Sequence, residues 1–234
     1  MKQILFTMML LFAYPCLATQ QDWIAQAEKG NPQAQYRIGK SYLVGDTIKK
    51  DISKALFWIE KAVAQQEPRA EYLLGLCYYK GEGKEKNDSL AYQNFKRSAL
   101  QGYPLAQYSL ALRYLRGEGT SKNQSRAFHW FRKASEGGVM QARYSMGVRL
   151  QKGEGVDKHP ELALSLYREL ALQTPHDPFF DYFLGYSLYY GTCGRQDRNE
   201  GSRHIQRAAI NGCIEAQSLL TQIRQKRENV PVKF

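Results

Sequence analysis

The sequence repeats at an interval of 36 residues. Alanine, tyrosine and glycine recur on this grid in four successive segments, at Ala34, Ala70, Ala106 and Ala142, at Tyr36, Tyr72, Tyr108 and Tyr144, and at Gly45, Gly81, Gly117 and Gly153. A fifth segment continues two residues out of phase, with Tyr182, Gly185, Gly191 and Gly201. A fixed period of roughly 20 to 50 residues indicates a repeat protein, in which each segment packs against its neighbours.

Each segment has the pattern of two helices. In the third one, small and apolar residues recur at helical spacing in two stripes, Ala106, Leu110 and Tyr114 and then Ala127, Phe131 and Ala134. Glycines follow both stripes, and glycine readily takes the left-handed conformation that ends a helix. The sequence therefore predicts antiparallel helix pairs. One pair cannot bury its apolar face alone, so the pairs must stack into an all-α solenoid.

The grid divides the chain into five repeats between two caps. We expect repeats at residues 31–66, 67–102, 103–138, 139–174 and 175–212, an N-terminal capping segment at 19–30, a C-terminal capping helix at 213–228 and a flexible tail at 229–234. The fifth repeat begins irregularly, because Pro175 and Pro178 prevent an uninterrupted helix. A bend or a change of spacing is expected between the fourth and fifth repeats.

The first 18 residues have the composition of a signal peptide. Lys2 is followed by an apolar or neutral run at 4–13, and Cys16 and Ala18 stand at the −3 and −1 positions of a cleavage site. The run of about ten residues is shorter than the roughly 18 that a spanning helix needs. We expect cleavage near Ala18, a periplasmic or secreted protein, and no transmembrane segment after cleavage. An uncleaved anchor and a lipidated Cys16 are the alternatives.

The charge of the chain favours an acidic partner. The formal net charge is +11, and removing Lys2 with the signal peptide leaves +10. Lysines and arginines are dispersed, with no dense basic block, which argues against a nucleic-acid tail. Acidic protein surfaces, anionic lipid head groups and acidic polysaccharide all fit a basic chain of this kind.

The sequence contains no recognisable catalytic or metal-binding motif. The four histidines are scattered, and the recurring Gly-Glu-Gly segments are interpreted as helix terminators rather than phosphate loops. Their carboxylates, Glu82, Glu118 and Glu154, should lie roughly 10 Å or more apart, near the starts of second helices. We therefore predict that the chain is not an enzyme and has no cofactor or metal.

Three cysteines follow the signal peptide, and they do not form a disulfide framework. A helix of roughly 20 Å is expected between Cys193 and Cys213, whereas a disulfide needs Cα atoms within about 7 Å. An intramolecular bond between these two is not expected. Cys77 is predicted to occupy an exposed helix position as a free thiol.

The third repeat resembles a known family. Its first helix contains Ala106-Gln107-Tyr108-Ser109-Leu110-Ala111 and ends in Gly117-Glu118-Gly119, and its second contains Ala127, Trp130, Phe131 and Ala134. This pattern resembles the Sel1-like repeat, a relative of the tetratricopeptide repeat, and it covers essentially all of residues 21–228. The resemblance implies a right-handed superhelical solenoid that acts as a scaffold for protein–protein contacts. It also suggests an exported bacterial member of the family.

The family includes several functions for exported members of this size. They include envelope-signalling regulators, flagellar-motor accessory proteins, host-interaction factors and periplasmic immunity proteins that neutralise secreted lipase toxins. A cysteine-rich branch is associated with penicillin binding and hydrolysis, but it carries a cysteine pair in most repeats, whereas only Cys77 lies in a first helix here. We expect an interaction scaffold of the cell envelope, monomeric on its own. A periplasmic immunity protein is the alternative, and a β-lactam or cell-wall hydrolase a weaker one.

In such solenoids the first helices line the concave wall, so their free stripe is the expected binding surface. The predicted partner-binding residues are Arg37, Lys40, Lys80, Arg113, Arg116, Arg149, Lys152, Phe183 and Tyr186. They predict a basic groove with an aromatic end that receives an acidic segment of another protein. Cations also favour helix C-termini, which is the alternative explanation for Lys80, Arg116 and Lys152. Arg113 and Arg149 lie a turn further in and favour the groove.

Overall fold

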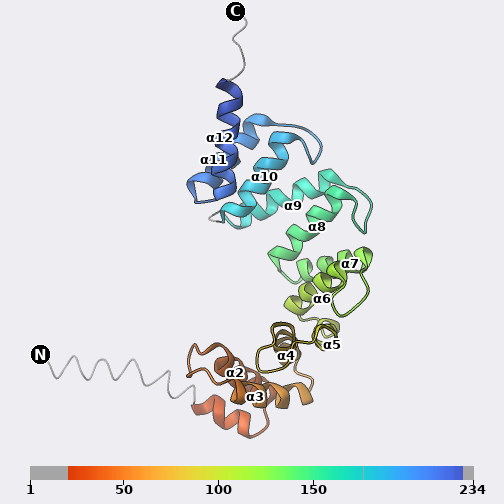
Figure 1. Cartoon of the computed structure of the whole chain (residues 1–234), viewed down its shortest axis with the longest axis vertical. Coiled ribbons are helices and arrows are strands. Elements are labelled where there is room, and N and C mark those ends of the chain that lie inside the picture. The colour runs from red at the N-terminus through yellow and green to blue at the C-terminus, as the bar shows by residue number, and fades with distance from the viewer. Residues whose placement is uncertain (1–20, 176, 229–234) are drawn as a thin grey trace, which may run out of the picture. The chain divides into compact units, whose positions relative to one another are not determined.

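A computed structural model describes residues 21–175 and 177–228, and these residues form helices, turns and loops without any strand (Figure 1). The predicted signal peptide, its cleavage site and the predicted C-terminal tail lie outside the described residues.

The helices alternate between first and second members of each pair. The first helices are α2 (Pro32–Val44), α4 (Pro68–Lys80), α6 (Pro104–Arg116), α8 (Met140–Lys152) and α10 (Pro178–Tyr190). The second helices are α3 (Ile52–Ala64), α5 (Asp88–Leu100), α7 (Gln124–Glu136), α9 (Pro160–Gln173) and α11 (Arg198–Ile210). A further helix covers residues 21–28, and α12 (Ile214–Glu228) follows the last pair. The predicted all-α repeat solenoid is confirmed.

The predicted change of spacing before the fifth repeat is also present. First helices begin at residues 32, 68, 104 and 140, a step of 36, and then at 178, a step of 38. One of the two extra residues lengthens α9 to 14 residues, and the other lengthens the turn that follows it.

Local residues determine where these helices begin and end. The second helices α3, α5, α7 and α11 begin after Asp51, Asn87, Asn123 and Asp197, whose side chains accept a backbone N–H of the first turn. Each first helix ends at a glycine in the left-handed conformation, at Gly45, Gly81, Gly117, Gly153 and Gly191. The helix-terminator interpretation of the repeated glycines is therefore correct.

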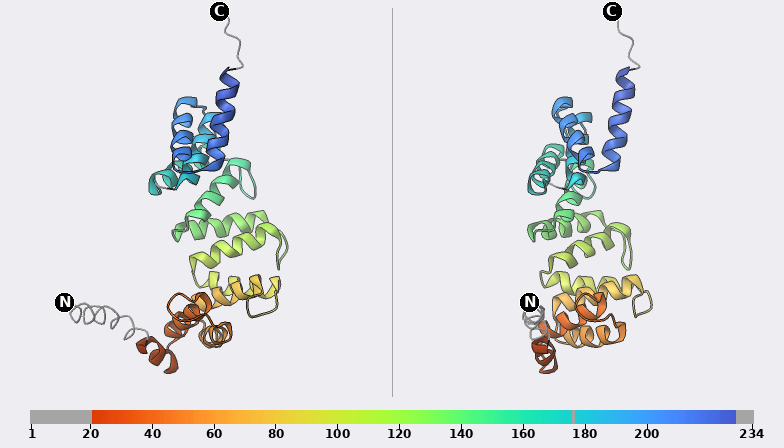
Figure 2. Two further views of the ribbon diagram at one scale, coloured as in Figure 1. Left: turned by 60° about the vertical axis from the view of Figure 1, so that its left-hand side comes forward. Right: turned by 90° about the vertical axis from the view of Figure 1, so that its left-hand side faces the viewer.

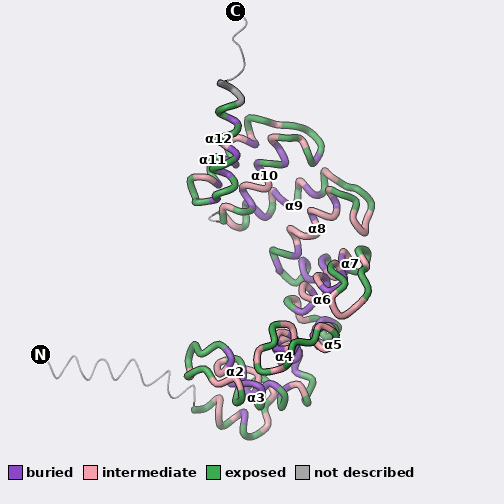
Figure 3. Tube along the Cα trace, viewed as in Figure 1, coloured by how far each residue is buried: buried purple, intermediate pink, exposed green. Residues whose placement is uncertain are grey.

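The described chain forms two compact units, residues 21–122 and 123–228. Buried residues in each unit gather between neighbouring helices (Figure 3), around Ile59 and Leu74 in the first unit and around Tyr167 and Leu184 in the second. Glycine brings the two helices of a pair close together. A Cβ on Gly75 would lie 2.8 Å from the ring of Phe95, which is closer than side chains tolerate.

The helix at residues 21–28 takes the place of a second helix. Gln35 Nε2 donates to the carbonyl of Ala27 at 3.1 Å, as Gln107 Nε2 donates to that of Ala99 at the end of α5. Ala27 is buried against Ala34 and Ile38 of α2. This helix therefore covers the apolar face of α2, as a capping segment does.

None of the helices in residues 21–175 and 177–228 combines the length and apolar character required to cross a bilayer.

The predicted exposure of Cys77 is wrong, because the residue is only 1% exposed. The loop after α4 folds back over this position, where the amide of Glu82 donates to the carbonyl of Cys77 at 3.0 Å. Cys77, Cys193 and Cys213 are all buried free thiols.

Candidate partner-binding surfaces

Arg113 lies inside the first unit, which corrects its assignment to a groove. Its side chain is only 3% exposed, the guanidinium carbon lies 4.1 Å from the centroid of the Tyr79 ring, and Nη1 contacts the Glu118 carboxylate. Arg113 Nε has no hydrogen-bond acceptor among the described residues. The charge is held by one carboxylate and one aromatic face, so Arg113 stabilises the fold and is not accessible to a partner.

Arg149 has a similar environment in the second unit. Its side chain is 12% exposed, its Nη2 lies 3.6 Å from Glu154 Oε2, and its guanidinium carbon lies 5.7 Å from the Phe131 ring centroid. The carboxylate of Glu154 in the loop therefore partly neutralises the guanidinium of Arg149, which the sequence analysis assigned to partner binding.

The loop after each first helix explains both results. It folds back so that the amides of Glu118 and Glu154 donate to the carbonyls of Arg113 and Arg149. The sequence does contain a signal for this burial. The equivalent residues in the other repeats are Ser41, Cys77 and Ser187, which are small or apolar as a covered position requires.

The cations at the helix ends remain exposed, and two of them lie near loop carboxylates. Arg116 and Lys152 are the last residues of α6 and α8, and their nitrogens lie 3.9 Å from Glu118 and 4.0 Å from Glu154. Lys80 is likewise exposed at the end of α4. These positions fit the alternative explanation, in which cations interact with the negative ends of helices. Their role in binding remains a prediction.

Arg37 and Lys40 line a groove in the first unit, with a volume of about 460 Å³. The groove lies along α2 and receives Trp23 from the preceding helix and Arg69 from α4. The guanidinium carbon of Arg37 lies 4.1 Å from the Trp23 ring centroid, and that of Arg69 lies 4.6 Å from the Tyr36 ring centroid. This site combines three cations with aromatic faces.

The charge of this groove is only partly compensated. Arg69 Nε pairs with Glu67 at 2.6 Å, and Asp46 also lines the groove. Within residues 21–175 and 177–228, no carboxylate lies within 4.0 Å of the charged nitrogens of Arg37 or Lys40. Both side chains are exposed, so two cations are available to a ligand at this end of the first unit.

The positive charge does not continue along the first helices. The residues equivalent to Lys40 in α4 and α6 are Leu76 and Leu112, which are partly buried. At this position of the first helices, the first unit therefore carries a cation only in the first repeat, and the exposed cations of α4 and α6 are those at the helix ends.

The predicted aromatic residues Phe183 and Tyr186 belong to an aromatic stripe on α10 of the second unit. Its members are Phe179, Phe183, Tyr186 and Tyr190, spaced by four, three and four residues so that they share one helix face. Phe179 and Phe183 have ring centroids 4.6 Å apart, and Tyr186 and Tyr190 have centroids 4.7 Å apart. Phe179, Tyr186 and Tyr190 are 43%, 39% and 42% exposed, so this aromatic surface is available to a ligand.

The remaining charged cluster of the second unit has a structural role. Asp181 of α10 is buried, and its carboxylate pairs with Arg207 and lies 3.0 Å from His204 Nδ1, both residues belonging to α11. Its equivalent in α4, Glu71, pairs in the same way with Arg97 of α5 at 3.2 Å. These pairs join the two helices of a repeat. No group of histidines, cysteines and carboxylates suited to a metal ion occurs in the described part of the chain.

Comparison with known proteins identifies the repeat. The model of the Sel1 repeat family matches residues 32–66, 68–103, 104–139, 141–174 and 180–213, well over half of the chain. No curated protein sequence matches the chain.

Two solved structures resemble the chain in sequence and fold. A Sel1 repeat protein from Oxalobacter formigenes is 31% identical with a TM-score of 0.74, and the match covers 83% of this chain and 76% of that protein. A protective antigen of uropathogenic Escherichia coli with an SLR fold is 26% identical with a TM-score of 0.66. That match covers 92% of this chain and only 53% of the antigen, so this chain spans about half of its length. A Sel1 repeat protein of Klebsiella pneumoniae, 17% identical over 88% of this chain and 99% of its own length, shares the fold with a TM-score of 0.52.

Proposed function

Because the chain belongs to the Sel1 repeat family, a scaffold for protein interaction, we propose that it is an exported scaffold that holds an acidic segment of a protein partner in the groove around Arg37 and Lys40. One observation carries the proposal. Arg37 and Lys40, two exposed cations without carboxylate partners in the described chain, line the same groove, and the guanidinium of Arg37 stacks on the ring of Trp23.

This arrangement suits a carboxylate ligand. Arginine binds carboxylates through two parallel hydrogen bonds, and its stacking on Trp23 fixes the plane of the guanidinium before a ligand arrives. Holding the side chain in place reduces the entropy that binding costs. Lys40 adds a second positive charge about one helical turn from Arg37. Two acidic residues of a partner segment, whether helical or extended, can therefore contact both cations.

The aromatic stripe of α10 is the second contact that we assign to a partner. Aromatic residues are enriched among the side chains that contribute most to binding at protein interfaces. Tyr186 and Tyr190 offer apolar rings and hydroxyl groups at an exposed helix face. A basic site in the first unit and an aromatic site in the second give the scaffold two contacts of different chemistry.

We assign the scaffold to the periplasm or the exterior of the cell, because residues 1–18 have the pattern of a signal peptide. The relative from uropathogenic E. coli is a protective antigen, which agrees with an exported protein. N-terminal sequencing of the native protein tests this assignment. A mature chain that begins at Thr19, or within two residues of it, supports export with cleavage, whereas an intact Met1 contradicts a cleaved signal peptide.

Affinity capture from the native envelope tests the binding role. The full-length protein is compared with the double variant Arg37→Glu, Lys40→Glu, and with Lys86→Glu, Lys122→Glu as a control. The control makes the same change of charge at two exposed loop positions for which the structure shows no ion pair. We expect a protein that elutes with salt from the wild type and the control and is missing from the groove variant. A partner captured equally by all three proteins contradicts the proposal.

A further inference from the structure

The last helix, α12, has the characteristics of a first helix. Ala216 occupies the position of the alanine that is buried in α2, α4, α6 and α8, and it is itself fully buried. Gln217 Nε2 donates to the carbonyl of Ala209 at 3.0 Å. The same bond, between residues eight apart, joins Gln35 to Ala27 and Gln107 to Ala99. We infer that α12 begins a sixth helix pair, and the described residues supply no second helix to complete it.

The other pairs show where the missing helix would pack. Glu60, the ninth residue of α3, pairs at 2.6 Å with Lys84 in the loop of the next pair. Arg168, the ninth residue of α9, pairs with Glu200 on α11, the second helix of the next pair. Gln206 is the ninth residue of α11 and is therefore equivalent to Glu60 and Arg168. A second helix beside α12 would therefore lie over Gln206.

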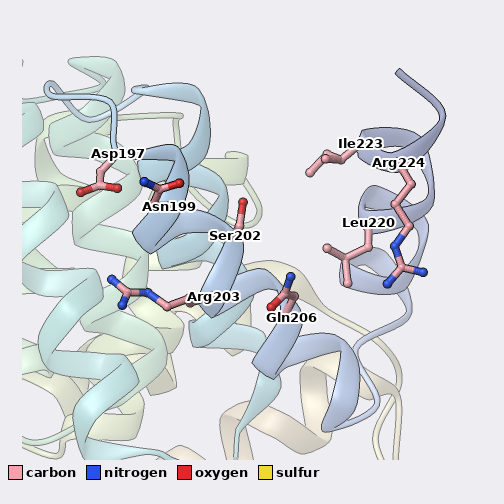
Figure 4. Close-up of a pocket in the computed structure, with 8 residues that line it drawn as sticks. All are labelled: Asp197, Asn199, Ser202, Arg203, Gln206, Leu220, Ile223 and Arg224. Carbon is pink, nitrogen blue, oxygen red and sulfur yellow. The ribbon is translucent and has the colours of Figure 1, made fainter. Parts of the chain in front are cut away.

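A groove is present at this position. It has a volume of about 660 Å³ and is lined by side chains of α11 and α12 and by Asp197, whose side chain caps the start of α11 (Figure 4). Leu220 and Ile223 point from α12 towards α11, where Ser202 and Gln206 stand on the facing side. In both further views the C-terminal turns of α12 extend past α10 and α11 (Figure 2).

One residue of α12 affects how closely a helix can pack there. In α10 the eighth residue is Gly185, and a Cβ there would lie 2.8 Å from Ile205 Cγ1 of α11. The eighth residue of α12 is Thr221, which is exposed and whose hydroxyl donates to the carbonyl of Gln217. The Cβ of threonine prevents the close approach that glycine permits. A helix on α12 must therefore stand further out, in a looser and more polar contact than the pairs inside the units.

We propose that the groove between α11 and α12 binds an amphipathic, acidic helix of a partner protein, which supplies the second helix of the sixth pair. Its apolar side contacts Leu220 and Ile223, and its carboxylates face Arg224. Within the described chain, no carboxylate lies within 4.0 Å of the charged nitrogens of Arg203 or Arg224, the two arginines that line the groove. A second copy of this chain is a poor occupant, because each copy has a formal net charge of +11 and the groove itself is lined by Arg203 and Arg224.

The proposal is independent of the groove around Arg37 and Lys40, and a defined probe tests it. The probe is a synthetic peptide with the sequence of α9, Pro160–Gln173, held helical by a hydrocarbon staple and labelled with a fluorophore. This sequence is a second helix of the same repeat type and carries Glu161 and Glu169. We expect saturable binding to the full-length protein by fluorescence anisotropy, together with slower hydrogen exchange in α12.

Variants on both walls of the groove locate the binding. Arg224→Glu at the exposed end of α12 and Ser202→Trp on α11 are each expected to weaken binding by about tenfold or more. Lys158→Glu is the control, an exposed loop residue of the second unit with the same change of charge as Arg224→Glu. A peptide in which Glu161 and Glu169 are replaced by lysine should also bind about tenfold more weakly.

The outcomes separate this proposal from the proposed function. Unchanged affinity in Arg224→Glu and Ser202→Trp, or no binding of the α9 peptide, overturns the helix-binding groove. The double variant Arg37→Glu, Lys40→Glu should bind the peptide as the wild type does. Circular dichroism of each variant confirms that the helices are intact, so a loss of binding cannot be attributed to unfolding.

Discussion

The guanidinium of Arg113 packs against the ring of Tyr79 and the carboxylate of Glu118, with almost no contact with solvent. A buried charge of this kind depends on its partner, because removing one member leaves the other unpaired in a poorly solvated site. Arg37 is also stacked on a ring, that of Trp23, but its guanidinium lies at an exposed groove. Two arginines of the first unit therefore differ in role, one stabilising the fold and the other available for binding.

We predict that Arg113→Ala lowers the free energy of unfolding by about 2–4 kcal/mol, because it removes a buried ion pair and a cation–π contact. Arg37→Ala should change the free energy of unfolding by less than about 1 kcal/mol. Urea denaturation followed by circular dichroism measures both. Equal stabilities of the two variants would contradict the burial of Arg113.

Burial also affects the thiol of Cys77, whose pKa it raises from 9.0 to about 11. The folded chain then keeps the thiol proton up to about pH 11, whereas the unfolded chain releases it near pH 9. Stability from this group is therefore complete below pH 9 and is lost as the pH rises towards 11.

We predict that the wild type loses up to about 2 kcal/mol of unfolding free energy relative to Cys77→Ala between pH 9 and 11. The comparison with the variant cancels the titration of lysines and tyrosines that both proteins share. Denaturation midpoints at several pH values provide the measurement. A difference between the two proteins that is constant over this range would show that the thiol is accessible to solvent.

At the scale of the helices, the sequence predicts most of the fold and less of the surface. The 36-residue grid predicts the helix pairs, the glycine terminators and the two-residue shift before α10, because each depends on local residues. The burial of Arg113 and Cys77 depends on a loop that folds back over the helix. Helical periodicity alone does not predict this loop. A comparison of equivalent positions in the repeats does indicate this burial, because serine or cysteine occupies the position of Arg113 and Arg149 in the other repeats.

The third prediction concerns the packing of the loop after α8, which contains Gly155. Gly155 and Gly138 both have positive φ, 78° and 86°, but a Cβ on Gly155 would lie 2.3 Å from the backbone of Gln124, whereas Gly138 has nothing within 4 Å. Gly138→Ala should cost about 1 kcal/mol of stability, from the left-handed conformation alone. Gly155→Ala should cost about 3 kcal/mol or more, because the loop must also move away from α7. Equal losses in thermal or urea unfolding would show that the loop does not pack on α7.

At the scale of the whole molecule, net charge indicates the type of partner but not where it binds. The chain carries +11, yet the arginines and lysines beside Glu118 and Glu154 are locally compensated. Among the cations without an ion pair in the described chain, Arg37 and Lys40 line a groove in the first unit, and Arg203 and Arg224 line one in the second. Composition predicts an acidic partner, whereas locating its contacts requires the ion pairs, which depend on the folded loops.

The central claim, that Arg37 and Lys40 hold an acidic segment, is tested most directly by titrating the captured partner at several salt concentrations. Calorimetry should show that Arg37→Glu, Lys40→Glu weakens binding by about a hundredfold at low salt, and that the affinity of the variant depends less on salt than that of the wild type. Lys86→Glu, Lys122→Glu should retain the wild-type affinity and salt dependence. If the groove variant binds with the affinity and salt dependence of the wild type, the partner does not occupy this groove and the claim is wrong.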